Sequence, residues 1–237
     1  MPSDLIIFDF NGYKLSNPDN NPIITNNGTL ELMSGTINMS GTGAAISNNK
    51  NLTITGGTIR SSSNNTSAIN NNANATLIMT GGNVTATGSR QAIYDDGGTV
   101  TISGTAELIS SAKFEGTSKP RATVQANAAT SNITILGGLI VSNHSSGVGV
   151  TNLGTVTIGS QGSGIDITNP VIRGYSKAVY SASGKTLNIY DGILQSRSST
   201  VLDGTTTNIE PNSQPNTSGT VQIGGATYNT WYLESTN

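Results

Sequence analysis

A pair of apolar residues separated by one residue recurs along this chain at nearly constant intervals. The pairs are Leu30/Leu32, Leu52/Ile54, Leu77/Met79, Val100/Ile102, Ile133/Ile135, Val156/Ile158 and Leu187/Ile189. Successive pairs are 22, 25, 23, 33, 23 and 31 residues apart, so the usual step is about 23 residues and the two long steps indicate insertions. Self-similarity at a period of about 20–50 residues is typical of solenoids and other repeat architectures.

Each repeat contains two further apolar positions. The second position is occupied by Ile37, Ile59, Val84, Leu108, Ile140, Ile172 and Leu194. The third is occupied by Ile46, Ile69, Ile93, Val124, Val150, Val179 and Val201. Phe8/Phe10, Leu15 and Ile24 fit an additional first repeat, and Val221/Ile223 are predicted to begin one more turn. We therefore expect about eight rungs of three short strands over residues 4–225, followed by a C-terminal cap or the start of another segment over residues 226–237.

This pattern predicts an all-β, single-stranded parallel β-helix. A short strand with alternating apolar residues buries one face and exposes the other. If the chain winds into a triangular coil, each strand pairs with its equivalent one rung further along, and aliphatic side chains fill the axis. An antiparallel β-sandwich, which also has short strands at regular spacing, is the alternative.

A small polar residue follows the third apolar position by two residues in nearly every repeat. These residues are Asn26, Asn48, Asn71, Asp95, Asn152, Ser181 and Asp203, with Ala126 as the exception. Asn and Asp tolerate tight corners and bond to neighbouring backbone amides, and stacked side-chain amides can hydrogen-bond to one another. We expect a structural asparagine ladder at one corner of the coil.

The composition favours an exported protein without disulfides. Charged residues make up 10% of the chain, the net charge is −2, and there is no cysteine. Soluble domains average about 25% charged residues, and this chain has no basic patch for nucleic acid. Its apolar runs are too short for a bilayer. We expect a secreted or cell-surface bacterial protein, not inserted in the membrane, whose signal, anchor and flanking domains lie outside this segment.

Three stretches resemble one known family. "IIFDFNGYKL" (Ile6 to Leu15), "GTLELMSGTI" and "LTITGGTI" resemble the pectin-lyase-like, right-handed parallel β-helix repeats of bacterial cell-surface, adhesin-like proteins. The resemblance covers roughly residues 5 to 225. It implies right-handed winding, and an adhesive, carbohydrate-associated or stalk-forming role.

The catalytic signatures of such folds are missing. Polygalacturonase-like hydrolases use clustered aspartates with "GHG" and "RIK" motifs, which this chain lacks; it has one histidine, His144. Asp95 already has a corner role, and Asp166, Asp191 and Asp203 are expected in different parts of the coil. We predict no catalytic residue, no metal site and no cofactor. A polysaccharide lyase or hydrolase with an atypical site remains the alternative.

Two outward faces are candidate binding surfaces. The first-sheet column is predicted to be Glu31, Thr53, Ile78, Thr101, Thr134, Thr157, Asn188 and Gln222, a threonine-rich face that gives ice binding as a minor alternative. The second-sheet face becomes aliphatic in later rungs, at Ile109, Leu139, Val141, Val171 and Ile193. A solvent-facing aliphatic strip requires a reason: either it is covered by the insertions Ser111–Arg121 or Gly159–Pro170, or it forms a groove rimmed by Arg173, Gln195 and Arg197.

Aromatic residues complete the candidate site. Carbohydrate sites place aromatic platforms beside polar groups, and Tyr175, Tyr180 and Tyr190 fall within two rungs, the last two predicted to face outward together with Tyr94. Tyr228, Trp231 and Tyr232 are expected to close the end of the core. The sequence therefore predicts a non-catalytic β-solenoid that acts in adhesion or carbohydrate binding, or as a rigid spacer, with glycans or a surface protein as its partner.

Overall fold

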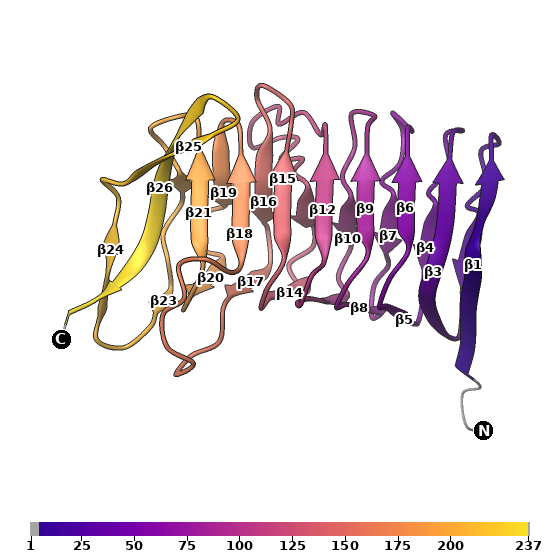
Figure 1. The fold of residues 1–237 in the computed structure, drawn as a ribbon, viewed down its shortest axis with the longest axis horizontal. Helices are drawn as coiled ribbons and strands as arrows, with labels where there is room; N and C mark the ends of the chain where they lie inside the picture. The colour runs from indigo at the N-terminus through magenta and orange to yellow at the C-terminus, as the bar shows by residue number, and fades with distance from the viewer. Residues whose placement is uncertain (1–4, 237) are drawn as a thin grey trace.

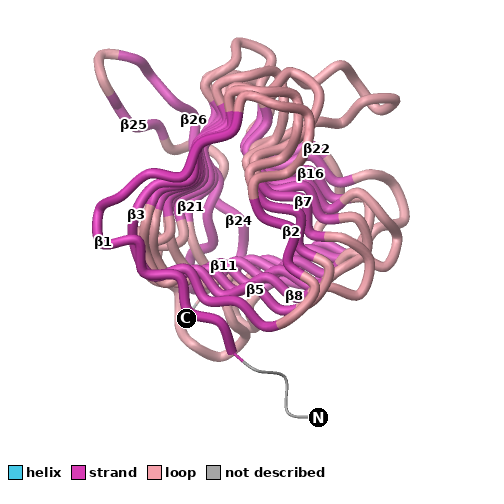
Figure 2. Tube along the Cα trace, turned by 90° about the vertical axis from the view of Figure 1, so that its right-hand side faces the viewer, coloured by secondary structure: helices cyan, strands magenta, loops and turns pink. Residues whose placement is uncertain are grey.

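The computed structural model describes residues 5–236 and is a β-solenoid of about nine turns with about 24 residues per turn. Figure 1 shows its strands side by side along the long axis, and Figure 2 shows the coil end-on around a central core. Equivalent strands of successive turns pair in parallel, as β5 (Asn51–Ile54) does with β8 (Thr76–Met79). The predicted parallel β-helix is confirmed, and the sandwich is excluded because its neighbouring strands would be antiparallel.

The turns build three faces. The first sheet contains the early parts of β1 (Leu5–Asn17) and β3 (Thr29–Met39), then β5, β8, β11 (Thr99–Ile102), β14 (Asn132–Ile135), β17 (Thr155–Ile158), β20 (Thr186–Ile189) and β23 (Asn208–Ile209). The second contains the later parts of β1 and β3, then β6 (Thr58–Ser61), β9 (Asn83–Ala86), β12 (Glu107–Ser110), β15 (Leu139–Ser142), β18 (Val171–Gly174) and β21 (Ile193–Ser196). The third contains β2 (Ile24–Asn26), β4 (Ile46–Asn48), β7 (Ile69–Asn71), β10 (Ile93–Asp95), β13 (Val124–Ala126), β16 (Val148–Asn152), β19 (Lys177–Ser181) and β22 (Leu202–Asp203).

The apolar positions of the repeat stack inside the coil. Leu52 pairs with Leu77, Leu77 with Val100, and all three are at most 1% exposed. The second and third positions behave in the same way, as Ile59 and Ile69 do at 1% and 0% exposure. Full burial of an aliphatic side chain contributes roughly 1.5–3 kcal/mol, so the axial stack is the main source of stability.

Paired glycines form the corner between the first two sheets. Gly57 and Gly82 have φ of +80° and +79°, a left-handed conformation that disfavours side chains. A Cβ on Gly82 would lie 2.8 Å from the Gly56 carbonyl oxygen of the preceding turn. Glycine at this corner therefore lets successive turns approach closely.

The asparagine ladder is present at the corner after the third sheet. Asn26 Nδ2 donates to Asn48 Oδ1 over 2.7 Å, Asn48 Nδ2 to Asn71 Oδ1 over 2.8 Å, and Asn71 Nδ2 to Asp95 Oδ1 over 2.6 Å. Ala126 follows Asp95 in the stack and interrupts the ladder. Beyond it, Asn152 Nδ2 donates to Ser181 Oγ over 3.1 Å. The ladder is confirmed for these residues.

Asp203 does not join the ladder, so that prediction is wrong. The register shifts by one residue in the last third-sheet strand, where Val179 pairs with Leu202 and Tyr180 with Asp203. The Val201 carbonyl accepts hydrogen bonds from the amides of Ala178 and Val179. Asp203 therefore lies opposite Tyr180 and not opposite Ser181, and its Oδ2 lies 3.3 Å from Lys177 Nζ.

An antiparallel cap closes the C-terminal end. β24 (Ser213–Asn216) and β25 (Thr220–Ile223) both pair antiparallel with β26 (Ala226–Ser235), which pairs antiparallel with β21. Val221/Ile223 therefore do not begin another turn, because the chain reverses into a hairpin. Trp231 and Leu233, which are 6% and 1% exposed, close the core, and this was predicted for Trp231. Tyr228 and Tyr232, for which the same role was predicted, stay half-buried outside the core.

Candidate functional site

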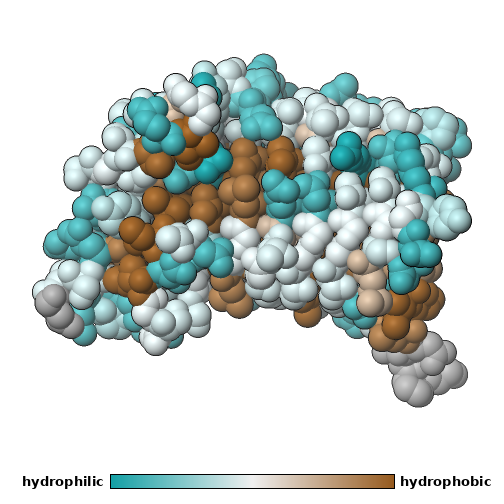
Figure 3. Space-filling view, in the orientation of Figure 1, coloured by the Kyte–Doolittle hydropathy of each residue, from teal (hydrophilic) through white to brown (hydrophobic). Residues whose placement is uncertain are grey.

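The outward side of the second sheet carries an apolar strip in its later turns. Parallel pairing aligns Glu107, Leu139, Val171 and Ile193 in one column, and Ile109, Val141, Arg173 and Gln195 in the next. The aliphatic members of both columns are half-buried. In Figure 3 a band of hydrophobic side chains crosses this face of the molecule.

The two insertions leave this strip open. Ser111–Arg121 packs on the third sheet instead, where the Phe114 and Tyr180 rings lie 5.3 Å apart. Gly159–Pro170 hangs below β17 and β18 (Figure 1), where Asn169 Oδ1 accepts a hydrogen bond of 2.8 Å from the Gly138 amide. The expected cover is therefore not found among the described residues; the second insertion forms a rim.

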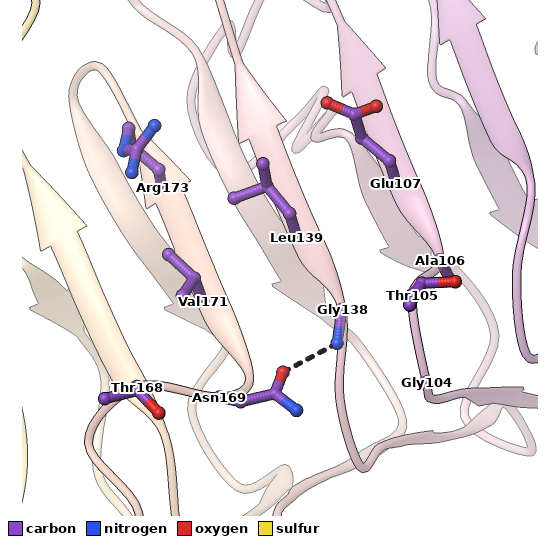
Figure 4. A pocket seen from close by; sticks show the side chains of 10 residues that line it. All are labelled: Gly104, Thr105, Ala106, Glu107, Gly138, Leu139, Thr168, Asn169, Val171 and Arg173. Carbon is purple, nitrogen blue, oxygen red and sulfur yellow. Dashed lines mark hydrogen bonds between the residues drawn. The ribbon is translucent and has the colours of Figure 1, made fainter.

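A groove of about 550 Å³ lies along the strip. It is lined by Gly104, Thr105, Ala106, Glu107, Gly138, Leu139, Thr168, Asn169, Val171 and Arg173. Figure 4 shows Leu139 between the carboxylate of Glu107 and the guanidinium of Arg173, with Val171 next to Leu139 on the strand that carries Arg173. The groove thus has an aliphatic floor with opposite charges at its two ends.

Two arginines and two tyrosines gather beyond the Arg173 end of the groove. Arg173 Nε donates to Gln195 Oε1 over 2.8 Å, and the Arg197 guanidinium lies 4.6 Å from the Tyr175 ring centre. Both guanidiniums face the Tyr228 ring, at 5.5 and 5.3 Å from its centre. We refer to Arg173, Tyr175, Gln195, Arg197 and Tyr228 as the arginine–tyrosine cluster.

The cluster is positively charged and internally ordered. Within residues 5–236 no carboxylate forms an ion pair with Arg173 or Arg197. Burial lowers the pKa of the Arg173 guanidinium, whereas contacts with the Tyr228 and Tyr175 phenols raise the pKa of Arg197. Both remain protonated at physiological pH. The cation–π contacts hold the guanidiniums in place for an anion.

Of the predicted site residues, Arg173, Tyr175, Gln195 and Arg197 come together, whereas Tyr180 and Tyr190 lie elsewhere. Tyr180 belongs to the third sheet and is only 8% exposed, because Phe114 of the first insertion covers it. Tyr180 points outward as predicted, but it is covered, so the prediction that it offers an accessible platform is wrong. Tyr190 is half-buried just after β20, at the opposite end of the second-sheet strands from the cluster.

Sequence reasoning missed Tyr228 as a site residue. Its place follows from the antiparallel pairing of β26 with β21, in which Ser196 faces Asn229, so that the neighbouring residues Arg197 and Tyr228 also meet. Arg197 Nε lies 3.3 Å from the Tyr228 hydroxyl. The repeat pattern carries no signal for this contact, because β26 is not part of the repeat.

Two acidic residues that were expected to lie apart come into contact. The second insertion folds back so that the amide of Asp166 donates to the Asp191 carboxylate, which also accepts a 2.8 Å bond from the Gly192 amide. Burial raises the pKa of Asp191, whereas hydrogen bonds from Thr168 lower that of Asp166. Asp203 lies elsewhere, beside Lys177.

Asp95 and the threonine-rich first-sheet column belong to the repeating framework of the coil. Asp95 is fully buried in the ladder. The threonine-rich first-sheet column is aligned as expected except at its end, where Asn208, and not Gln222, follows Asn188. Among the described residues, no group of three or more acidic, histidine or cysteine side chains is placed to hold a metal ion. In the same range, no helix long and apolar enough to span a bilayer is found.

The chain matches no protein-family model, no curated protein and no solved structure in the three comparisons made.

Proposed function

We propose that this protein is a non-catalytic binding module of an exported bacterial surface protein, and that it holds an acidic carbohydrate along the second-sheet groove. The observation that carries the proposal is the arginine–tyrosine cluster: two ordered guanidiniums without an acidic partner in residues 5–236, at the end of an open groove. Composition and the family resemblance support the surface location.

The chemistry of the cluster favours a carboxylate or sulfate group. Guanidinium is planar and binds such anions through two parallel hydrogen bonds. Arg173 and Arg197 are already oriented by Gln195 and by the tyrosine rings, so little side-chain entropy is lost when the ligand binds. Because the tyrosine faces are occupied by guanidiniums, the rings orient the arginines and do not serve as free sugar platforms. Leu139 and Val171 offer an apolar floor to the C–H face of adjoining sugars.

The proposal is tested by titrating the protein calorimetrically with oligogalacturonate and with its neutral methyl ester. Hydrogen bonds to charged groups contribute about 1.5–3 kcal/mol, so Arg173→Ala and Arg197→Ala should each weaken binding about tenfold or more. Arg60→Ala is the matched control, since Arg60 faces outward from the same sheet several turns away. Equal binding by all three variants, or equal binding of acid and ester, contradicts the proposal.

A polysaccharide-active enzyme is the second candidate, favoured by Asp166 and Asp191. Their pKa values are displaced in opposite directions, as in the acid and base of many glycosidases. The alternative is a purely structural role, in which the Asp191 carboxylate anchors the second insertion. Release of new reducing ends from polysaccharide, abolished by Asp191→Asn, would establish an enzyme; absence of turnover together with absence of glycan binding would leave a spacer.

A further inference from the structure

A second hollow lies on the outward side of the third sheet, far along the chain from the cluster. It encloses about 240 Å³ and is lined by Asn65, Thr66, Ser67, Asn70, Arg90, Gln91 and Tyr94. These residues come from β7, β10 and the turns that precede them. None of them belongs to the arginine–tyrosine cluster or the second-sheet groove.

The hollow lies at a step in the molecular surface. The outward column of the third sheet runs from Asn70 and Tyr94 to Gln125, Thr151 and Tyr180. The last three are buried and the first two are half-exposed, because the insertion Ser111–Arg121 covers only the later turns. The open outward face of the third sheet at Asn70 and Tyr94 meets the edge of the insertion Ser111–Arg121 here, which creates a concave site.

The floor of the hollow is a fixed polar network. Gln91 is 2% exposed; its Oε1 accepts a 3.0 Å bond from Ser67 Oγ, and its Nε2 donates to Gln125 Oε1. Gln125 Nε2 donates to Asn127 over 3.0 Å, and Asn127 Nδ2 donates to Asp96 over 2.9 Å. The side-chain amides of Gln91 and Gln125 are buried and fully partnered, so they hold one orientation and the floor is rigid before any ligand arrives.

The walls carry polar groups with unused hydrogen-bonding capacity. No described residue bonds to the side-chain amides of Asn65 and Asn70, and no ring or guanidinium of residues 5–236 stacks on Tyr94. Arg90 uses Nε to bond the Asn64 carbonyl over 2.9 Å, and no described residue bonds to its terminal nitrogens. Burial and the nearby Asp96 carboxylate raise the pKa of the Tyr94 phenol, so it stays neutral.

We propose that this hollow is a second ligand site, which binds a neutral monosaccharide. A free aromatic face suits the C–H face of a pyranose, while two amides and a guanidinium can donate to and accept from its hydroxyls. The positive charge of Arg90 and the negative charge of Asp96 both lie close to Tyr94 and offset each other, so the hollow has no net charge that would select an anionic sugar. The site does not depend on the acidic-carbohydrate proposal, since the two share no residue.

The test is an NMR titration of the backbone amides with glucose, galactose and N-acetylglucosamine, using galacturonate as the anionic comparison. A single sugar with few contacts should bind with a dissociation constant on the order of 1 mM. At least one neutral sugar should shift the amides of Asn70, Gln91 and Tyr94, and galacturonate should shift them less. Asn70→Ala and Tyr94→Ala should each weaken that binding about fivefold or more.

Two controls separate a lost site from a lost fold. Asn38→Ala removes an equally half-exposed amide that faces outward from the second sheet, and Arg197→Ala disables the other proposed site. Both should bind the neutral sugar as the wild type does. The proposal is overturned if no neutral sugar shifts these amides, if galacturonate binds more tightly, or if Asn70→Ala and Tyr94→Ala bind as the controls do.

Discussion

Replacing Asn48 by alanine tests how much the ladder contributes to stability. Asn48 is fully buried; its Nδ2 donates to Asn71 Oδ1 over 2.8 Å and to the Thr76 carbonyl over 3.0 Å, and its Oδ1 accepts from Asn26 over 2.7 Å. Each hydrogen bond contributes about 1 kcal/mol, and a stranded buried partner costs about 1–3 kcal/mol more. Asn48→Ala should therefore lower the free energy of unfolding by about 3–5 kcal/mol, a large part of the roughly 5–15 kcal/mol typical of proteins.

The assay is urea unfolding followed by circular dichroism, with Asn49→Ala as the matched control. Asn49 stacks in the same way between Asn27 and Asn72, but in solvent. Exposed substitutions usually change stability by no more than about 0.5 kcal/mol. In a chain of this size a loss of 3–5 kcal/mol corresponds to a melting temperature lower by roughly 6–20 °C. Equal stability of Asn48→Ala and Asn49→Ala would refute the reasoning that burial gives the ladder its strength.

Three further predictions concern the buried carboxyl and the two covering segments. Asp95 is buried, its Oδ2 lacks a partner among the described residues, and burial raises its pKa. The folded state therefore holds the proton more tightly than the unfolded state. As a result, stability falls as the pH rises from the ordinary pKa of 3.8 through the raised pKa of the folded state. Asp95→Asn should remove that loss, so urea unfolding at pH 3 and pH 7 should show the variant gaining on the wild type at the higher pH; a constant difference would contradict this. Trp231→Ala should cost about 3–5 kcal/mol by opening the end of the core, measured by thermal unfolding against the half-buried Tyr232→Ala, and equal losses would argue against a closing role. Phe114→Ala should expose Tyr180, seen as faster tyrosine quenching by acrylamide without loss of the β-sheet circular dichroism signal; unchanged quenching would mean that Phe114 does not cover it.

The sequence predicts the coil well because its periodicity reflects the packing of every turn. An inward residue such as Leu77 or Ile93 must be apolar, and a corner residue such as Asn71 must hydrogen-bond to its equivalent in the next turn. The same residue type therefore recurs at each of these positions once per repeat. In β1 the predicted register is wrong by two residues, because Leu30 and Leu32 pair with Ile6 and Phe8 and not with Phe8 and Phe10. The register also fails where the repeat is perturbed, at Asp203 and at Val221/Ile223. At those points a one-residue shift and a chain reversal depend on tertiary contacts that no periodic pattern encodes.

The candidate site was only partly predictable for the same reason. Arg173, Gln195 and Arg197 belong to second-sheet strands or follow them directly, so their grouping follows from the repeat. The accessibility of Tyr180 was predicted wrongly because it depends on where a non-repeating insertion packs. Tyr228 was missed because it lies in the cap. The meeting of Asp166 with Asp191 likewise depends on the path of an insertion.

The most direct measurement of the central claim is a crystal structure of the protein grown with oligogalacturonate. The account predicts a sugar carboxylate within about 2.7–2.9 Å of a guanidinium nitrogen of Arg173 or Arg197, with the adjoining ring over Leu139 and Val171. A sugar bound instead at Asp166 and Asp191, or an empty second-sheet groove at saturating ligand, would contradict it.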